Sequence, residues 1–102
     1  KRSIDVLSEF SGRKIFIFGD MFELGRFRKK HHVEIGSYAK NSKINILITF
    51  GKLSKFASIG FQKKSYNFYN EEQLKEFIAN FIKKNDIVLI KGSRGMKMER
   101  FI

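Results

Sequence analysis

The sequence predicts a small doubly wound, Rossmann-like α/β fold with a mostly parallel sheet and helices on both faces. Short apolar runs rich in β-branched and aromatic residues alternate with segments of helical periodicity, which is the pattern of repeated strand–helix units. A length of 102 residues indicates one domain, and 42% hydrophobic with 30% charged residues is typical of a folded protein. Right-handed crossovers between parallel strands favour the strand order 3-2-1-4.

The expected elements follow in order along the chain. Apolar residues at helical spacing predict the end of a helix over residues 4–10, closed by Gly12. Strands are expected at 14–18, 44–50, 66–69 and 86–90, and helices at 26–41, 53–60, 71–82 and from 96 to the end. Asn70 and Gln73 have the spacing of a capping box. The inward faces of the two longest helices would be His32, Ile35, Gly36 and Ala39, and Leu74, Phe77, Ile78, Phe81 and Ile82.

The last predicted strand leads into a candidate anion-binding turn. The run Ile87-Val88-Leu89-Ile90 is typical of a strand buried on both faces, and Lys91-Gly92-Ser93-Arg94-Gly95 follows it. The glycines allow several backbone N–H groups to point at one position. Ser93 supplies a hydroxyl, Lys91 and Arg94 supply positive charge, and the start of the next helix adds the positive end of its dipole. These features are typical of a binding site for a carboxylate or phosphate. The alternative is an ordinary strand-to-helix turn whose charges are solvated.

The predicted strand order brings two loops together. Between the first and fourth strands the winding reverses, and open α/β sheets bind ligands at such a switch point. The loops there would be 19–25 and 91–95. Asp20 and Glu23 could act as a general acid and base or bind a metal. Capping the helix that follows, or an ion pair of Glu23 with Arg94, is a commoner role for such side chains.

Several nucleotide-binding and metal-binding patterns are missing. Gly19 and Gly25 are too far apart for a dinucleotide fingerprint, and the sequence has no P-loop motif. It has no cysteine, which excludes disulfides and thiolate metal sites. The adjacent His31 and His32 would point to different helix faces, which is wrong for one metal site. Because His32 falls on the apolar face, a packed, hydrogen-bonded histidine is favoured over a ligand.

The chain is strongly basic. Lys and Arg number 21 against 10 Asp and Glu, which gives a net charge of +11 and suggests nucleic acid or an anionic surface as partner. The basic residues are spread along the chain apart from one dense stretch at 26–30, and most phenylalanines fall on core positions. Compositional drift therefore explains the charge better than a nucleic-acid footprint, and a basic nucleic-acid-binding module remains the alternative function.

No segment predicts a membrane protein or a secreted one. No apolar run approaches the roughly 20 residues that span a bilayer. No signal peptide is visible at the start, so the cytoplasm is the expected compartment.

The two loops, taken together, resemble the Mur ligase family. Gly19-Asp20-Met21-Phe22-Glu23-Leu24-Gly25 is similar to its G-D-M-x-E-L-G loop, and Lys91-Gly92-Ser93-Arg94-Gly95-Met96 with Glu99 is similar to its K-G-S-R-x-M-x-x-E segment. Between them, His32, Glu34 and Gly36 fit the H-x-E-x-G helix, and residues 3–7 fit the helix leading in. The similarity spans nearly the whole chain. Within the family it points to the ligase that adds D-alanyl-D-alanine to UDP-N-acetylmuramoyl-tripeptide in peptidoglycan synthesis.

This resemblance implies a role within a larger enzyme. Residues 1–102 would be the third of three domains and inactive alone. ATP and Mg²⁺ would be bound mainly by the central domain, and no cofactor by this chain alone. The enzyme would form an acyl phosphate on the peptide carboxylate, and the third domain would close over the site and help hold the incoming dipeptide. The expected partners are both substrates and the central domain, without nucleic acid or a membrane span, in a monomeric cytoplasmic bacterial enzyme.

The resemblance also implies roles for single residues. Lys91, Ser93 and Arg94 would face the dipeptide or the central domain, and Gly92 and Gly95 would shape their turn. Asp20, Met21 and Glu23 would form the opposite wall, supported by Gly19, Gly25, His32 and Glu99. No catalytic residue or metal ligand is expected in this domain. One departure stands out: Arg26-Phe27-Arg28-Lys29-Lys30 replaces a stretch that is usually acidic and contains serine, which puts in question any contact that this helix start makes.

Overall fold

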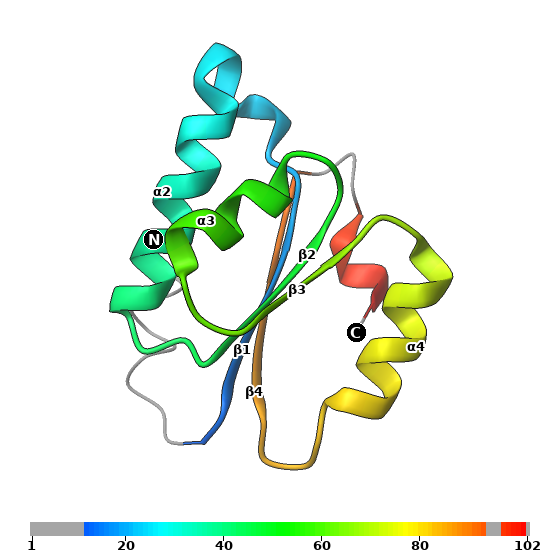
Figure 1. Cartoon of the computed structure of the whole chain (residues 1–102). Coiled ribbons are helices and arrows are strands. Elements are labelled where there is room, and N and C mark those ends of the chain that lie inside the picture. Colours follow the sequence, from blue (N-terminus) through cyan, green and yellow to red (C-terminus); the bar gives the residue numbers. More distant parts are fainter. Residues whose placement is uncertain (1–11, 94–96, 102) are drawn as a thin grey trace.

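The computed structural model of the chain describes residues 12–93 and 97–101. In that part, four parallel strands form one sheet in the order β3-β2-β1-β4 (Figure 1), which confirms the predicted fold class and strand order. The strands are β1 (Lys14–Gly19), β2 (Ile46–Phe50), β3 (Ser65–Phe68) and β4 (Ile87–Lys91). The helices are η1 (Phe22–Phe27), α2 (Arg28–Asn41), η2 (Ser54–Phe56), α3 (Ala57–Phe61), α4 (Glu71–Phe81) and η4 (Met98–Phe101), where η marks a 3₁₀ helix. The helix expected over residues 4–10 lies outside the described residues.

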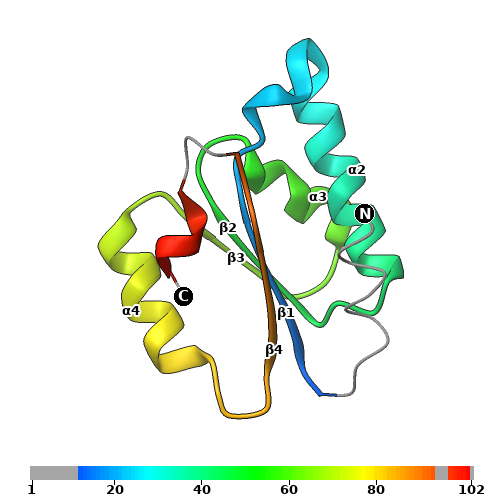
Figure 2. The same cartoon turned by 180° about the vertical axis from the view of Figure 1, so that it is seen from behind.

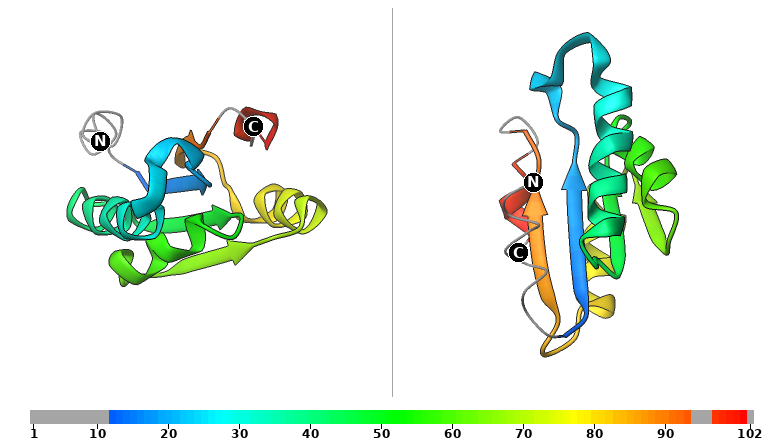
Figure 3. Two further views of the ribbon diagram at one scale, coloured as in Figure 1. Left: turned by 90° about the horizontal axis from the view of Figure 1, so that it is seen from above. Right: turned by 90° about the vertical axis from the view of Figure 1, so that its left-hand side faces the viewer.

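Helices cover both faces of the sheet. Figure 3 shows α2 and α3 on one side, with α4 and η4 on the other. Successive side chains of β1 point to opposite faces, so Phe16 and Phe18 pack against α2 and α3, while Ile15 and Ile17 pack towards α4. Every residue of β1 is buried. The candidate loop 19–25 therefore starts from a strand that is held firmly in the core.

The fourth strand corrects one prediction. Ile87, Val88, Leu89 and Ile90 are each only half-buried, so the expectation of a strand buried on both faces is wrong. The physical reason is position: β4 is the last strand in the order β3-β2-β1-β4, and β1 is its recorded neighbour. Both of its faces contact core residues, but neither is fully covered by the described part of the chain. A continuous apolar run therefore does not distinguish a central strand from an edge strand that packs on both faces.

Two glycines allow α2 and α3 to cross at close range. A Cβ added at Gly36 would collide with the carbonyl group of Ala57, and one added at Gly60 would collide with the carbonyl oxygen of Val33. His32, Gly36 and Ala39 are buried as predicted, and Ile35 is half-buried. Because the backbones of the two helices are in direct contact, α3 holds α2 in place, and α2 starts near the carboxyl edge of the sheet.

The cap of α4 forms as the sequence predicts. The Asn70 side chain accepts a hydrogen bond from the backbone N–H of Gln73 at 3.0 Å, and Glu71 and Glu72 stand in the first turn, where the helix dipole favours negative charge. Leu74 is fully buried, and the other four residues of the predicted stripe are half-buried against the sheet.

Two helix starts differ from the expected ones. Residues 22–27 form η1, so part of the expected loop is a 3₁₀ helix and α2 begins at Arg28. The last helix begins at Met98, also as a 3₁₀ helix, because Lys97 has a φ of 47°, outside the right-handed helical region. None of the described helices is long and apolar enough to cross a membrane.

An ion pair joins the start of β1 to the loop before β4. The Arg13 guanidinium donates to both carboxylate oxygens of Asp86, at 3.1 and 2.6 Å, and to the carbonyl oxygen of Phe81 at 2.8 Å. It also lies 4.4 Å from the centre of the Phe81 ring. The Asp86 side chain is only 8% exposed. The hydrogen bonds from Arg13, and then the one from the Lys83 N–H, lower the pKa of Asp86.

This ion pair predicts a loss of stability in acid. Because the pKa of Asp86 is lower in the folded chain than in the unfolded one, its contribution is complete near neutral pH and is lost as the pH falls below about 4. Asp86→Asn should therefore be less stable than the parent chain at pH 7 and should approach it near pH 3 in urea denaturation. Glu71→Gln removes a more exposed pair and is the control, with a smaller difference at pH 7. Parallel curves for Asp86→Asn and the parent chain across this range would contradict the assignment.

Candidate functional site

The carboxyl ends of β1 and β4 lie side by side, as Figure 2 shows. In the parallel register Phe18 is opposite Lys91, so Gly19 and Gly92 are the next pair. A Cβ added at Gly92 would lie 3.3 Å from the Cα of Gly19. The structure therefore brings the loops after the first and last strands together at the predicted switch point.

Ser93 connects the two loops through its backbone and its side chain. Its backbone N–H donates to the carbonyl oxygen of Asp20 at 2.9 Å, and its hydroxyl oxygen accepts from the N–H of Phe22 at 2.6 Å. Ser93 is 6% exposed. These contacts give the hydroxyl a role in holding η1 against the end of β4.

Met98 packs across both strand ends. A Cβ added at Gly19 would lie 2.6 Å from its sulfur, and a Cβ added at Gly92 would lie 2.7 Å from its Cγ. Met98 is 3% exposed. A side chain at either glycine would therefore displace Met98, and η4 packs against both loops from one side of the sheet.

The Asp20 carboxylate points towards the loop after β2. Its Oδ1 accepts hydrogen bonds from the N–H groups of Leu53 and Ser54, at 3.0 and 2.6 Å, so it caps the start of η2. A Cβ added at Gly51, which has a φ of 119°, would lie 2.5 Å from the same oxygen. Asp20 is 5% exposed. Through its side chain and its carbonyl group, this one residue joins the loops after β1, β2 and β4.

His32 binds the loop after β1 through a hydrogen bond to its backbone. It is fully buried, and its Nε2 accepts a hydrogen bond from the Met21 N–H at 3.1 Å. An amide N–H can only donate, so Nε2 is unprotonated and Nδ1 carries the proton, which it donates to the Arg28 carbonyl oxygen at 2.5 Å. This arrangement agrees with the expectation of a packed, hydrogen-bonded histidine.

The other predicted site residues differ in what the structure describes. Lys91 is exposed at the end of β4, and Met21 is half-buried against the core cluster that contains Phe16 and Phe18. Arg94 and Gly95 lie outside the described residues, as do the side chains of Glu23 and Glu99 and the surroundings of Gly25. The expected ion pair between Glu23 and Arg94 falls there as well.

The acidic side chain of the described part of the site serves the fold. The Asp20 oxygen that accepts two N–H groups is committed to the fold, and no group of three or more His, Asp or Glu side chains in the described residues could hold a metal ion. Sequence reasoning expected Asp20 to cap the helix that follows its own loop, whereas it caps η2, which follows β2. The packing of Met98 was missed, and no local signal indicates it.

The fold and the loop pair together define the class of protein. A small doubly wound domain presents two glycine-bordered, hydrogen-bonded loops at its switch point, which is a ligand-binding position in open α/β sheets. The chain belongs to the Mur ligase family: residues 1–94 match the family described as "Mur ligase, glutamate ligase domain". The resemblance found in the sequence is thereby confirmed.

Similar proteins agree with this membership. A UDP-N-acetylmuramoyl-tripeptide–D-alanyl-D-alanine ligase of Buchnera aphidicola (subsp. Baizongia pistaciae) is 40% identical over 99 residues, covering 95% of this chain and 21% of the relative. The Bacillus subtilis ligase of the same name is 35% identical over 96 residues, covering 89% and 21%. A crystal structure of MurF ligase from Thermotoga maritima in complex with ADP has a TM-score of 0.78 at 28% identity, covering 97% of this chain and 23% of that one. The chain spans about a fifth of the length of these curated relatives.

Proposed function

We propose that the chain is the C-terminal domain of a ligase that adds D-alanyl-D-alanine to UDP-N-acetylmuramoyl-tripeptide. The names of the relatives support this reaction, and the match over nearly the whole of this chain supports a domain of the same kind. The observation that carries the proposal is the contact between the loop after β1 and the end of β4, where Gly92 lies beside Gly19 and Ser93 is hydrogen-bonded to Asp20 and Phe22. A dipeptide carboxylate is the kind of anion that such a switch point can receive.

Within this proposal, cations after β4 bind the dipeptide. Lys91 is exposed at the strand end, and Arg94 follows in the sequence. Ser93 holds their turn in place, and Met21 with the main chain of the first loop forms the opposite wall. Asp20 contributes through the loops that it joins, because its carboxylate oxygen already accepts two N–H groups.

ATP and Mg²⁺ belong, in this proposal, to the larger part of the polypeptide. The T. maritima relative was crystallised with ADP, which supports ATP as the energy source of the whole enzyme. We propose that the central domain carries the nucleotide, that the enzyme works as a monomer in the bacterial cytoplasm, and that the domain described here is inactive alone.

The test uses the full-length polypeptide. Phosphate release should require ATP, UDP-N-acetylmuramoyl-tripeptide and D-alanyl-D-alanine together. Arg94→Ala and Lys91→Ala should each raise the KM for the dipeptide by about tenfold or more with little change in the KM for ATP, since a charge-assisted contact is worth about 1.5–3 kcal/mol. Lys84→Ala, an exposed lysine in the loop before β4, is the control and should leave both constants unchanged.

Two outcomes would contradict the proposal in different ways. A full-length enzyme that releases no phosphate with this substrate pair would disprove the reaction. An active enzyme in which both substitutions change only the KM for ATP would disprove the carboxylate role of the turn and leave the reaction in place.

A further inference from the structure

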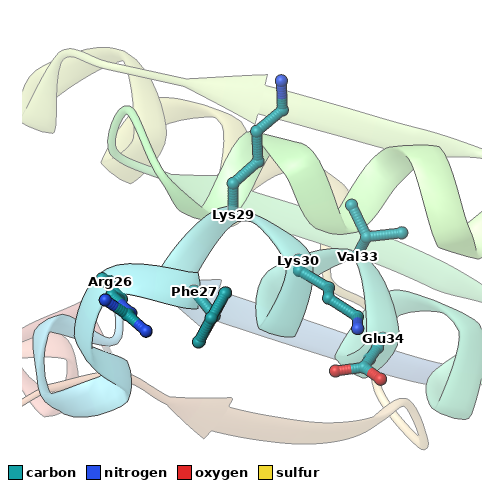
Figure 4. Close-up of a pocket in the computed structure, with 6 residues that line it drawn as sticks. All are labelled: Arg26, Phe27, Lys29, Lys30, Val33 and Glu34. Carbon is teal, nitrogen blue, oxygen red and sulfur yellow. The ribbon is translucent and has the colours of Figure 1, made fainter.

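The segment Arg26-Phe27-Arg28-Lys29-Lys30, here named the basic tip, projects beyond the carboxyl ends of the strands (Figures 1 and 3). It contains the end of η1 and the first turn of α2. A hollow of about 600 Å³ lies against it, lined by Arg26, Phe27, Lys29, Lys30, Val33 and Glu34 (Figure 4). The proposed ligase function uses none of these side chains.

The charges of the basic tip are not neutralised within the described part of the chain. The ion pairs recorded there join Arg13 to Asp86 and Glu71 to both Lys75 and Arg100. Glu34, the carboxylate that lines the hollow, lies 3.4 Å from Nδ1 of His31, and no ion pair recorded there joins it to a cation of the basic tip. The first turn of α2 has no acidic residue, and cations near the start of a helix are disfavoured by its dipole. Helix stability therefore does not explain why four cations stand together here.

The basic tip also exposes an aromatic side chain. Phe27 is 55% exposed, and Phe22 at the other end of η1 is 47% exposed. The Arg26 guanidinium lies 5.1 Å from the centre of the Phe27 ring. Figure 4 shows Lys29 and Phe27 pointing to opposite sides of the chain. An exposed apolar ring beside a long cationic side chain matches a partner that has an apolar layer beneath an anionic one.

We propose that the basic tip binds the surface of an anionic lipid bilayer. Its lysines and arginines would contact headgroup phosphates, and the Phe27 ring would enter the boundary between headgroups and acyl chains. Nonspecific single-strand binding instead uses a cationic groove with several aromatic platforms. Here the cations stand on a projecting end of the molecule, and the hollow contains one aromatic ring, which favours the membrane surface. The inference is independent of the proposed ligase function.

The test measures sedimentation of the whole chain with lipid vesicles. The protein should sediment with vesicles of equal parts phosphatidylglycerol and phosphatidylcholine at about 50 mM salt, be released at about 500 mM, and ignore pure phosphatidylcholine. Lys29→Gln with Lys30→Gln should lower the partition coefficient about thirtyfold, because each basic residue near an anionic surface adds about fivefold. Phe27→Ser should also weaken binding.

Matched variants separate the basic tip from the overall charge. Lys63→Gln with Lys64→Gln removes the same charge from exposed positions before β3, at the opposite end of the strands, and Ile59→Ser removes an exposed apolar side chain from α3. These controls should each change the partition coefficient less than about threefold. The proposal would be overturned if the control and tip variants lost vesicle binding equally, or if the chain did not sediment with anionic vesicles at low salt. Binding to an oligo(dT) probe without binding to vesicles would also overturn it.

Discussion

Asp20→Ala should lower the free energy of unfolding by about 3 kcal/mol, because it leaves two N–H donors without their acceptor. The N–H groups of Leu53 and Ser54 both donate to the lost oxygen, and that oxygen is buried beside Gly51. A loss of this size is a large part of the 5–15 kcal/mol that typically holds a domain folded. Urea denaturation of the chain at pH 7 measures it directly.

Asp20→Asn is the matched variant. An amide oxygen can still accept from Leu53 and Ser54, although a bond to a neutral acceptor is weaker than one to a carboxylate. The expected loss is about 1 kcal/mol. If Asp20→Ala were as stable as the parent chain, the cap at the start of η2 would not contribute to the fold, and the carboxylate would be available for a ligand instead.

Gly36→Ala should destabilise the chain by about 3 kcal/mol or more, through overpacking at the crossing of α2 and α3. The new Cβ would collide with the carbonyl group of Ala57, and backbone cannot move aside by changing a rotamer. A glycine-to-alanine change inside a helix ordinarily raises the free energy of unfolding by about 1 kcal/mol, so the expected loss has the opposite sign. Thermal and urea denaturation should both show the loss.

A second substitution to alanine in α2 is the control for helix propensity. Asn41 is exposed at the end of α2, and Asn41→Ala should be neutral or slightly stabilising. If Gly36→Ala were more stable than the parent chain, the two helices would have to be farther apart than the structure has them.

Much of the fold follows from local patterns. The alternation of strand-like and helical segments predicted four parallel strands, and the handedness of crossovers predicted their order. Asn70 identified its own helix start, because a cap acts within three residues. These features need no knowledge of distant contacts, which is why the sequence alone could predict them.

Features that depend on distant partners were harder to predict. The partial burial of β4 follows from its place at the end of the strand order, which its own residues do not encode. Asp20 is expected to cap the helix after its own loop, and nothing local indicates that it caps the short helix after β2 instead. The positions of the phenylalanines predict that most are in the core, and the exposure of Phe22 and Phe27 depends on how η1 leaves the sheet.

The candidate site was predicted in part by topology and in part by motifs. Strand order alone identified the two loops that meet, and the structure has them joined through Ser93. The residues of the turn themselves predict an anion site at Lys91 and Arg94, and the family resemblance implies that the anion is the dipeptide or that these residues face the central domain; both remain predictions. Backbone geometry does not reveal which anion a cationic side chain is meant to bind, so only measurements on the larger enzyme can test them.

Met98 makes the spacing of these loops sensitive to oxidation. Its side chain packs against two residues that have no side chain, and conversion to a sulfoxide would add a polar oxygen to this buried contact. Peroxide treatment should therefore separate the ends of β1 and β4 once the chain opens enough to react. A leucine at that position would keep a similar volume while removing the oxidisable atom.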